Sequence, residues 1–575
     1  MLFYLSIITP GSRDTGLCLL KPPHMDKPWL QHYPAGVPAN IDPEQYPRLM
    51  DMVEESFKKF ADSPAYVSMG KTLTFGEVDK LSTQFGAYLL SRGLVAGDRV
   101  AIMMPNLLQY PIALIGALRA GLVVVNTNPL YTPREMRHQF MDSGTKAIII
   151  AENFAANLQQ ILGETQINTV IVASIGEMLG LKGYIVNFVV RSIKKMVPKF
   201  NILNTVTFKS ALNEGSKFSL PPLTSGPDDT IILQYTGGTT GVSKGAMLTN
   251  RNLVANMMQI RAIMMPVLGG NNLTVLCPLP LYHIFAFTVN CLAIMSVGGR
   301  NILIVNARDL PALIKDWRKY KPALVTGVNT LYNALLNHPN FASLDFSELK
   351  ASVGGGMAVQ RAVAERWQQV TGCPLTEGYG MTESSPVISC NPLNTSMRIG
   401  TIGMPAPSTD VRIADEAGNL TPLGQVGEIQ AKGPQVMKGY WQRPEATAEV
   451  MKDGWLCTGD MGIMHPDGFF QIVDRKKDMI LVSGFNVYPN EVEDVVAMHP
   501  KVLEVAALGI PDEKSGEVVK IFVVKKDPSL NEKELIEHCR LNLTGYKVPK
   551  KVEFRTELPK TNVGKILRRA LREEK

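Results

Sequence analysis

Short apolar runs rich in β-branched residues alternate with helical patterns over most of the chain. The runs at 99–104, 122–126, 146–151, 169–174, 230–235, 273–279, 301–305 and 323–326 predict buried strands. Around the first of these runs, 75–92 and 109–119 repeat apolar residues with helical spacing. Such alternation is typical of parallel sheets covered by helices on both faces. We therefore expect an α/β fold with a large N-terminal domain built from parallel-sheet α/β subdomains.

The pattern changes twice toward the C-terminus. From about Val411, short strands separated by Gly, Asp and Asn turns predict a small β-rich element. After Asp474 the chain has its own strands (502–509 and 518–525) and helices (490–498 and 532–541), which predict a small α+β domain. We expect the N-terminal domain to span 25–473 and the C-terminal domain 474–575. Met25 begins the stretch MDKPWLQHYP, so residues 1–24 are expected to be an extension without a role in the fold.

Composition is that of a globular protein with more than one domain. At 575 residues the chain is too long for one compact core, and 45% apolar with 19% charged residues is ordinary. The net charge of +7 permits contact with anionic ligands but is no nucleic-acid signature. Seven scattered cysteines form no CxxC pair and no metal-ligand spacing, which indicates a reducing compartment. No window approaches the roughly 18–20 apolar residues of a membrane span, so we expect a cytoplasmic protein.

One segment, 183–200, has an amphipathic pattern with basic residues. Four apolar residues fall on one face of a helix: Ile185, Val189, Ile193 and Met196. Three basic residues fall on a roughly opposite face: Arg191, Lys195 and Lys199. One interpretation is an ordinary surface helix packed on the core. The other is a basic helix in peripheral contact with the anionic inner face of the membrane.

The strongest local signal is a glycine-rich loop directly after the run 230–235. Its glycines let successive N–H groups face a phosphate, while hydroxyl groups and an ammonium add donors. The loop is not of the Walker type, because no Gly-Lys pair is followed by Ser or Thr in the required register. We interpret it as a phosphate-binding loop rather than a simple turn. Its candidate residues are Tyr235, Thr236, Gly237, Gly238, Thr239, Thr240, Gly241, Ser243 and Lys244.

Four further clusters carry groups suited to a nucleotide. Segment 377–383 (EGYGMTE) places an aromatic ring beside glycines, then a hydroxyl and a carboxylate that suit a base and Mg²⁺. Segment 453–460 (DGWLCTGD) ends in a carboxylate able to accept from two ribose hydroxyls. Segment 474–484 (DRKKDMILVSG) lies at the change of pattern, and 559–569 (PKTNVGKILRR) holds a lysine behind a glycine. Each alone could be a capped turn, a hinge or a solvated basic face.

Together, in this order and spacing, these motifs resemble the adenylate-forming superfamily of acyl-CoA synthetases, aryl-CoA ligases, adenylation domains and beetle luciferases. The resemblance extends from about Trp29 to Arg569. Within the superfamily the chain is most similar to bacterial long-chain fatty acid–CoA ligases, through 453–484 and through 280–288 (PLYHIFAFT). It departs at Cys457, where many relatives have histidine, and at Asn250, where they often read Thr-His-Arg-Asn.

The resemblance implies a ligation in two steps. The carboxylate of a fatty acid attacks the α-phosphate of ATP, which gives an acyl-adenylate and pyrophosphate, and the thiol of coenzyme A then displaces AMP. ATP, a fatty acid and coenzyme A are the implied substrates, and Mg²⁺ is the implied cofactor. The glycine-rich loop cradles the β- and γ-phosphates, an aromatic ring beside a glycine turn stacks on adenine, an aspartate binds the ribose, and an arginine reaches the ribose or a phosphate. The residues implied for these roles outside the loop are Gly355, Gly356, Tyr379, Asp460 and Arg475.

The resemblance also implies the catalytic groups and a domain movement. Thr382 contacts phosphate, Glu383 holds Mg²⁺, and Lys565 bridges the α-phosphate and the substrate carboxylate. Relatives rotate a mobile C-terminal domain about a hinge that matches Asp474, so that the loop at Gly484 then admits coenzyme A.

The acyl end of the site is harder to assign from the sequence. His283 in PLYHIFAFT is either a core histidine or a group that positions or gates the substrate carboxylate. An apolar tunnel is expected around it, lined by Phe285, Phe287, Val325, Gly327 and Val328. The segment 280–288 contains no Asp that could pair with a substrate ammonium, which argues against an amino-acid adenylation domain.

Other functions stay open at this stage. An aryl- or medium-chain acid–CoA ligase, an acyl-AMP ligase and a luciferase-like oxygenase share the motifs. A non-catalytic protein that binds acyl groups or nucleotides would not need Lys565 on a mobile domain. Acyl chain length, a homodimer and membrane contact are not decided by these motifs.

Overall fold

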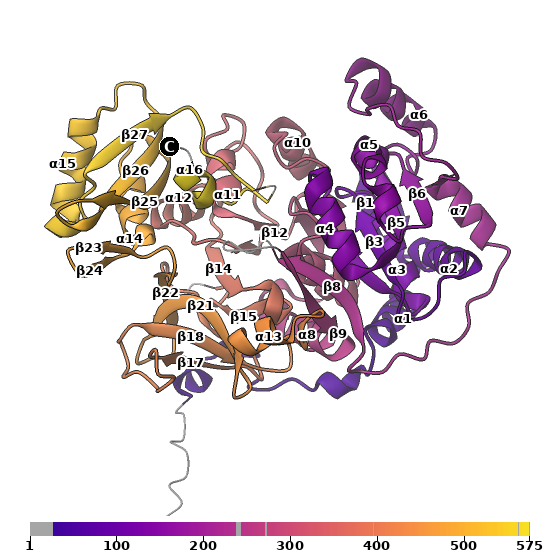
Figure 1. Ribbon diagram of the computed structural model, residues 1–575, viewed down its shortest axis with the longest axis horizontal. Helices are drawn as coiled ribbons and strands as arrows, with labels where there is room; N and C mark the ends of the chain where they lie inside the picture. Colours follow the sequence, from indigo (N-terminus) through magenta and orange to yellow (C-terminus); the bar gives the residue numbers. More distant parts are fainter. Residues whose placement is uncertain (1–26, 237–242, 271–272, 395, 562, 574–575) are drawn as a thin grey trace, which may run out of the picture.

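The computed structural model describes residues 27–236, 243–270, 273–394, 396–561 and 563–573. The expected extension over 1–24 lies outside the described residues, as do the loop residues Gly237, Gly238, Thr239, Thr240 and Gly241. The described chain forms two large sheets with helices around them, then a β-rich sheet and a C-terminal sheet (Figure 1). The expected α/β class is therefore confirmed. No helix within the described ranges is long and apolar enough to cross a membrane.

The first large sheet has the strand order β19-β9-β8-β4-β3-β5-β6-β7. Neighbours from β8 to β7 run parallel, whereas β9 and β19 are added antiparallel at one edge. Alternate residues of a strand lie on opposite faces of the sheet. In β3, Val100 and Ile102 therefore join a core with α2 and α3, while Ala101 and Met103 join another with α4 and α5. The strands are β3 (Arg99–Met103), β4 (Val123–Asn126), β5 (Thr145–Ala151), β6 (Thr169–Ala173), β7 (Val206–Thr207), β8 (Thr230–Thr236), β9 (Lys244–Thr249) and β19 (Gly439–Tyr440). The helices around it are α1 (Leu49–Phe60), α2 (Phe75–Ser91), α3 (Gln109–Arg119), α4 (Pro133–Ser143), α5 (Ala155–Gln159), α6 (Leu181–Phe188) and α7 (Phe208–Gly215).

The second large sheet has the order β16-β15-β14-β13-β12-β10-β11-β1-β2 and shares a continuous apolar core with the first. Its strands from β14 to β1 run parallel, so their carboxyl ends meet at one edge. Ligands of open parallel sheets bind at that edge. The strands are β1 (Pro64–Ser68), β2 (Lys71–Thr74), β10 (Thr274–Cys277), β11 (Arg300–Leu303), β12 (Leu324–Gly327), β13 (Ala351–Gly354), β14 (Leu375–Gly380), β15 (Val387–Cys390) and β16 (Met404–Pro405). The helices are α8 (Asn250–Leu268), α9 (Ile284–Ala286), α10 (Leu310–Tyr320), α11 (Asn329–Leu336) and α12 (Arg361–Thr371).

The remaining elements are the ones expected after Val411. The β-rich sheet is antiparallel and contains β17 (Asp410–Ala414), β18 (Gly427–Lys432), β20 (Met451–Lys452), β21 (Trp455–Met464) and β22 (Phe470–Arg475), with α13 (Pro444–Val450) beside it. The C-terminal unit has its own apolar core and contains β23 (Ile480–Val482), β24 (Phe485–Val487), β25 (Val502–Asp512), β26 (Gly516–Lys525), β27 (Lys551–Arg555), α14 (Pro489–Ala497), α15 (Glu532–Asn542) and α16 (Arg568–Glu573). Figure 1 shows this unit, in yellow, beside α11 and α12.

The amphipathic segment 183–200 is not one regular α-helix, and its predicted apolar and basic faces are not arranged as expected. The α-helix ends at Phe188 and continues as a π-helical turn over Val189–Ile193. Arg191 does not belong to a free basic face, because its guanidinium pairs with Glu152 at 2.8 Å. The apolar face is not packed on the core either, since Ile185 and Ile193 are exposed.

Candidate active site

A cavity of about 1400 Å³ lies between the carboxyl ends of the parallel strands, the β-rich sheet and the C-terminal unit. It collects most of the described residues that the sequence singled out: Tyr235, Thr236, Lys244, His283, Gly355, Gly356, Tyr379, Thr382, Glu383, Asp460, Asp474, Arg475 and Lys565. Ser243 does not line it, and its carbonyl accepts a 2.8 Å hydrogen bond from His138 Nε2. Gly484 lies outside it, in the turn between β23 and β24 with φ at +83°.

A buried carboxylate with two fixed neighbours occupies one wall of the cavity. Asp460 and Arg475 face each other across the β21–β22 ladder, with Arg475 Nε 3.4 Å from Asp460 Oδ1. The Tyr379 hydroxyl, at the end of β14, donates a 2.7 Å hydrogen bond to Asp460 Oδ2. Burial, followed by the charge of Asp460, raises the pKa of the Tyr379 phenol well above its usual value. Tyr379 is therefore a hydrogen-bond donor at every physiological pH, and it holds the carboxylate in place.

A second carboxylate, Glu383, lies in the 3₁₀ turn that follows β14. The Tyr440 hydroxyl donates a 2.6 Å hydrogen bond to Glu383 Oε1, and burial raises the pKa of this carboxyl. The Lys244 ammonium lies 5.1 Å from the centre of the Tyr440 ring. Tyr440 can make both contacts because β19 pairs with β9, which begins at Lys244. The end of the glycine-rich loop and Glu383 are thus connected through one aromatic side chain.

Lys565 and His283 line the cavity from two different parts of the protein. Lys565 belongs to the C-terminal unit, whereas His283 lies between β10 and α9. Burial, and next the positive charge of Arg475, lower the pKa of the Lys565 ammonium to about 7. Burial, and next the charge of Lys565, lower the pKa of His283 to about 4, so the imidazole is neutral near pH 7. A bound anion between these groups would favour the charged form of Lys565.

The loop that carries Lys565 is held at both ends. The Lys565 N–H donates to Thr561 Oγ1 at 3.0 Å, and the Thr561 N–H donates to the Lys565 carbonyl at 2.7 Å. The Thr330 hydroxyl on α11 donates a 2.8 Å hydrogen bond to the carbonyl of Gly564. Gly564 has φ at +84°, and a Cβ there would lie 2.8 Å from Thr330 Oγ1. The close approach to α11 therefore needs glycine at this position.

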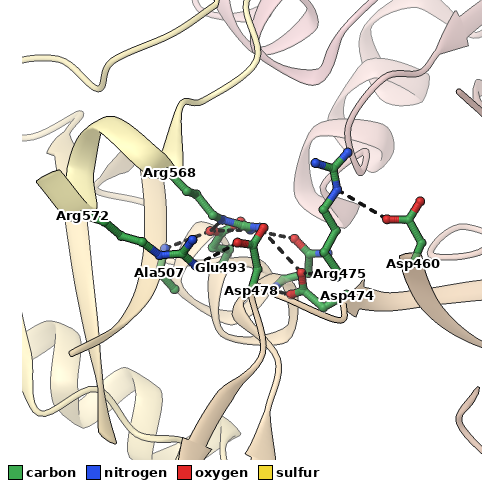
Figure 2. Close-up of polar contacts among 9 residues, drawn as sticks. Asp460, Asp474, Arg475, Asp478, Glu493, Ala507, Arg568 and Arg572 are labelled. Carbon is green, nitrogen blue, oxygen red and sulfur yellow. Dashed lines mark hydrogen bonds and ion pairs between the residues drawn. The ribbon is translucent and has the colours of Figure 1, made fainter. Parts of the chain in front are cut away.

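The hinge candidate Asp474 belongs to a buried charge cluster of the C-terminal unit, drawn in Figure 2. Its carboxylate accepts from the N–H groups of Arg475 and Asn490, at 2.7 and 2.8 Å, and lies 3.6 Å from Arg568 Nη1. Arg568 also donates to both carboxylate oxygens of Glu493 at 2.8 Å. Burial raises the pKa of Asp474 to about 6, and Arg568 opposes this rise. Arg568 therefore ties the segment that follows Lys565 to the strand end at Asp474.

The apolar part of the cavity differs from the expected tunnel. Of the five residues predicted to line it, Phe285 does so; Gly327 does not, and Phe287, Val325 and Val328 are packed inside the main core. The prediction was wrong for these four, because proximity to a motif in the sequence does not determine which side chains are buried in the core, as Phe287 is at the start of a π-helical turn. The apolar wall comes instead from one side of α8, through Ile260, Ile263 and Met264. Residues that line both this cavity and a neighbouring one of about 120 Å³ are Ile263, Cys390 and Leu393.

Sequence reasoning missed three side chains that shape the site. Tyr440 and Thr330 carry no recognisable local motif, and their contacts join residues 57 and 234 positions apart. Arg568 lies within 559–569, but the sequence assigned it no role. The signal that could have revealed its burial is the set of acids Asp474, Asp478 and Glu493, which only the fold brings around it.

Comparison with known proteins agrees with this architecture. The model of the AMP-binding enzyme family matches residues 53–441, and the AMP-binding enzyme C-terminal domain matches 491–565. A long-chain-fatty-acid–CoA ligase of Escherichia coli O6:H1 is 56% identical over 552 residues, which are 96% of this chain and 98% of that protein. Among solved structures, a benzoate CoA ligase from Burkholderia xenovorans LB400 is similar with a TM-score of 0.79 and 26% identity, covering 92% of this chain and 100% of that one. The anthranilate CoA ligase AuaEII in complex with anthranoyl-AMP has a TM-score of 0.83, 24% identity and coverages of 92% and 98%, which shows the same fold.

The family model covers more than half of the chain, and the relative of high identity covers nearly all of both sequences. The order of motifs and the convergence of their residues on one cavity fit these matches. The chain belongs to the AMP-binding enzyme family.

Proposed function

We propose that this protein is an AMP-forming long-chain fatty acid–CoA ligase. The observation that carries the proposal is the position of Lys565, in one cavity with the Asp460–Arg475 pair and with the apolar side of α8. A nucleotide and an acyl chain can meet there beside one ammonium group. The long acyl substrate is supported by the identity of 56%, over nearly the full length, to a long-chain-fatty-acid–CoA ligase.

The chemistry needs charge stabilisation rather than a protein nucleophile. A carboxylate oxygen of the fatty acid attacks the α-phosphorus of ATP, and the bond from that phosphorus to pyrophosphate breaks. The thiolate of coenzyme A then attacks the acyl carbon, and the carbon–oxygen bond to AMP breaks. Negative charge gathers at the α-phosphate in the first step, where a positioned ammonium lowers the barrier. Lys565 supplies this charge, and neutral His283 positions the carboxylate without competing for it.

The described nucleotide groups have the roles implied by the family resemblance. Asp460, held by Tyr379 and Arg475, accepts from the ribose hydroxyls. The adenine lies beside the Tyr379 ring and the turn at Gly355, where a Cβ would approach Phe285 and the Gly378 carbonyl to 3.0 and 3.1 Å. Thr382 and Lys244 contact the phosphates, together with the loop that precedes Lys244.

Glu383 is suited to hold Mg²⁺ in this site. Mg²⁺ is commonly bound by one or two carboxylates together with substrate phosphates. Glu383 is a buried carboxylate that lines the phosphate side of the cavity, and Tyr440 fixes it through Oε1. Mg²⁺ bound there would offset negative charge on the phosphates of ATP.

Two arrangements of the C-terminal unit serve the two steps. We assign residues 25–473 to the ATP- and acyl-binding domain and 474–575 to a mobile domain with its hinge at Asp474. The arrangement seen here delivers Lys565 to the cavity and leaves Gly484 outside it, which suits the adenylation step. Rotation about Asp474 would withdraw Lys565 and bring the Gly484 turn to the entry of coenzyme A.

The proposal extends to the place of action. The described helices offer no membrane span, and the cysteine pattern fits a reducing compartment. We place the enzyme in the cytoplasm, and the exposed apolar residues Ile185, Ile193 and Met196 support peripheral contact with the inner face of the membrane.

Pyrophosphate release tests the function directly. Purified protein with ATP and Mg²⁺ is offered fatty acids of six to eighteen carbons and 4-coumarate, with and without coenzyme A. Turnover that peaks with long chains and requires coenzyme A is expected. A preference for 4-coumarate would contradict the substrate class, and adenylation that never yields a thioester would contradict the second step.

A further inference from the structure

The helix α6 presents its apolar side to solvent. Its exposed apolar residues follow helical spacing at i, i+3, i+4 and i+7: Leu181, Tyr184, Ile185 and Phe188. Their exposed fractions run from 60% for Phe188 to 87% for Leu181. Three more apolar residues of the following segment are exposed by half or more: Ile193, Met196 and Leu203. Figure 1 shows α6 at the periphery, beyond β6 and α5.

The side of α6 that faces the protein combines small and polar residues with Val186, which packs against the main core. Gly183 touches the backbone of Gly176 so closely that a Cβ on Gly183 would lie 1.8 Å from the Gly176 carbonyl oxygen. One turn on, Asn187 accepts from the Gly176 N–H at 2.7 Å and donates to Ser174 Oγ at 3.0 Å. One turn further, Arg191 pairs with buried Glu152. This side docks through hydrogen bonds and an ion pair, together with the core contact of Val186 and the buried side chain of Val190.

The orientation differs from that of an ordinary surface helix, because the four largest apolar side chains of α6 face solvent. Surface helices of globular proteins turn their apolar stripe to the core and their polar side to water. Here the close backbone approach of Gly183, the polar contacts of Asn187 and Arg191 and the core contact of Val186 fix the helix, so its larger apolar side chains stay uncovered. Contiguous exposed apolar patches of this kind mark sites of interaction.

Charge indicates what covers the patch. The chain has no Asp or Glu between Glu177 and Glu214. Three lysines directly follow the helix, and all are exposed: Lys194, Lys195 and Lys199. An apolar stripe flanked by lysines without acids matches the interface of a bilayer with anionic headgroups. Two copies of this surface would bring like charges together, which disfavours self-association through it.

We propose that α6 and the lysine-bearing segment up to Lys199 form the docking surface for an anionic lipid bilayer. In this arrangement Leu181, Tyr184, Ile185 and Phe188 enter the headgroup–acyl boundary, and the lysines meet the headgroups. The proposal deepens the proposed function, since long-chain fatty acids reside in bilayers and the surface would bring the enzyme to them. The lipid surface, rather than a second protein, is the partner.

Vesicle flotation tests this surface with the full-length protein. Wild-type protein should float with vesicles that contain phosphatidylglycerol, much less with pure phosphatidylcholine vesicles, and less as salt rises. Tyr184→Ser combined with Ile185→Ser and Phe188→Ser should abolish flotation. Removing the charge of Lys194, Lys195 or Lys199 by substitution with Gln should weaken binding about fivefold for each lysine. A matched control replaces exposed apolar residues elsewhere, Leu541→Ser with Leu423→Ser, and should float like the wild type.

Ligase assays separate this proposal from the proposed function. With a long-chain fatty acid in detergent, the triple serine variant should match the wild type, whereas with the acid in anionic vesicles it should be slower. Absence of ligation in detergent by the wild type would contradict the function and leave the flotation result standing. Flotation that is equal in the wild type and the triple variant, or absent in both, would overturn the docking surface. A triple variant that changes from dimer to monomer while floating normally would assign the patch to a second copy.

Discussion

The side-chain hydroxyl of Thr330 donates a 2.8 Å hydrogen bond to the carbonyl of Gly564, the residue that precedes Lys565. The two residues are 234 positions apart, one on α11 and the other in the C-terminal unit. A second hydrogen bond from α11 to the C-terminal unit joins Asn333 Nδ2 to the Leu503 carbonyl at 2.8 Å. Both bonds belong to the arrangement that places Lys565 in the cavity.

Thr330→Val should therefore slow one half-reaction. The loss of one such hydrogen bond corresponds to about 1 kcal/mol, or roughly a fivefold decrease in the adenylation rate. Rates of pyrophosphate release and of thioester formation from supplied acyl-adenylate measure the two steps separately. Thr330→Ser keeps the donor and should restore adenylation. Equal slowing of both steps would show that the bond matters for general stability only.

Lys565→Ala should have a larger effect on the same step. Removing a positioned charge from a developing anion typically costs about 10²–10³-fold in rate. Thioester formation from supplied acyl-adenylate should stay within a few-fold of the wild type. Lys551→Ala, on the exposed side of β27, is the matched control and should leave both steps unchanged. Equal loss of both steps would contradict the two arrangements of the C-terminal unit.

The pH dependence of adenylation should follow Lys565. Its ammonium is the active form and its pKa is lowered to about 7, so kcat/KM of adenylation should fall as pH rises through about 7. Phosphate anions in the bound complex favour the ammonium, so the fall in kcat should lie at higher pH. In Lys565→Arg the charge persists, and the slower reaction should lose this limb of the profile. A wild-type kcat/KM that increases between pH 7 and 9, as general-base catalysis by an unprotonated amine would give, would contradict the assignment.

Arg568→Leu should destabilise the C-terminal unit. It leaves the buried Asp474 and the partly buried Glu493 without their shared cation, and breaking a buried pair typically costs about 3–5 kcal/mol. Urea unfolding followed by fluorescence measures the change. The neighbouring pair offers the control, because Arg569 and Glu573 are exposed. Arg569→Leu should change the free energy of unfolding by less than about 1 kcal/mol, and an equal effect of the two substitutions would refute the buried cluster.

Chain-length preference should respond to Ile263. This residue of α8 lines both the main cavity and the neighbouring one of about 120 Å³. Ile263→Trp should lower kcat/KM for the longest fatty acids by about tenfold or more and leave short ones nearly unchanged, since pocket volume discriminates by about 1–3 kcal/mol per methylene. The ratio of kcat/KM between eighteen and eight carbons measures this. An unchanged ratio would place the acyl chain elsewhere.

Much of the architecture could be predicted before any coordinates. The β-branched runs at 99–104 and 146–151 appear as β3 and β5, because residues that fit a buried strand do so in most contexts. The capping pair Thr74 and Glu77 explains why the periodic segment starting at Phe75 becomes α2 at the expected position. The predicted acyl tunnel was less accurate, since a local motif does not say whether Phe287 points to a cavity or to the core.

The sequence by itself determined the class of fold, the order of the nucleotide motifs and the chemistry that each could perform. These follow from local rules of periodicity, turn geometry and side-chain type. Only the tertiary structure formed the hydrogen bonds from Tyr440 to Glu383 and from Thr330 to Gly564, and the ion pairs of Arg568 with its acids. Such contacts join elements distant in the chain. The tertiary structure also decided which side of α6 meets the protein. A periodic pattern shows that a helix has an apolar side, whereas the hydrogen bonds of Asn187 and its neighbours decide whether that side is covered.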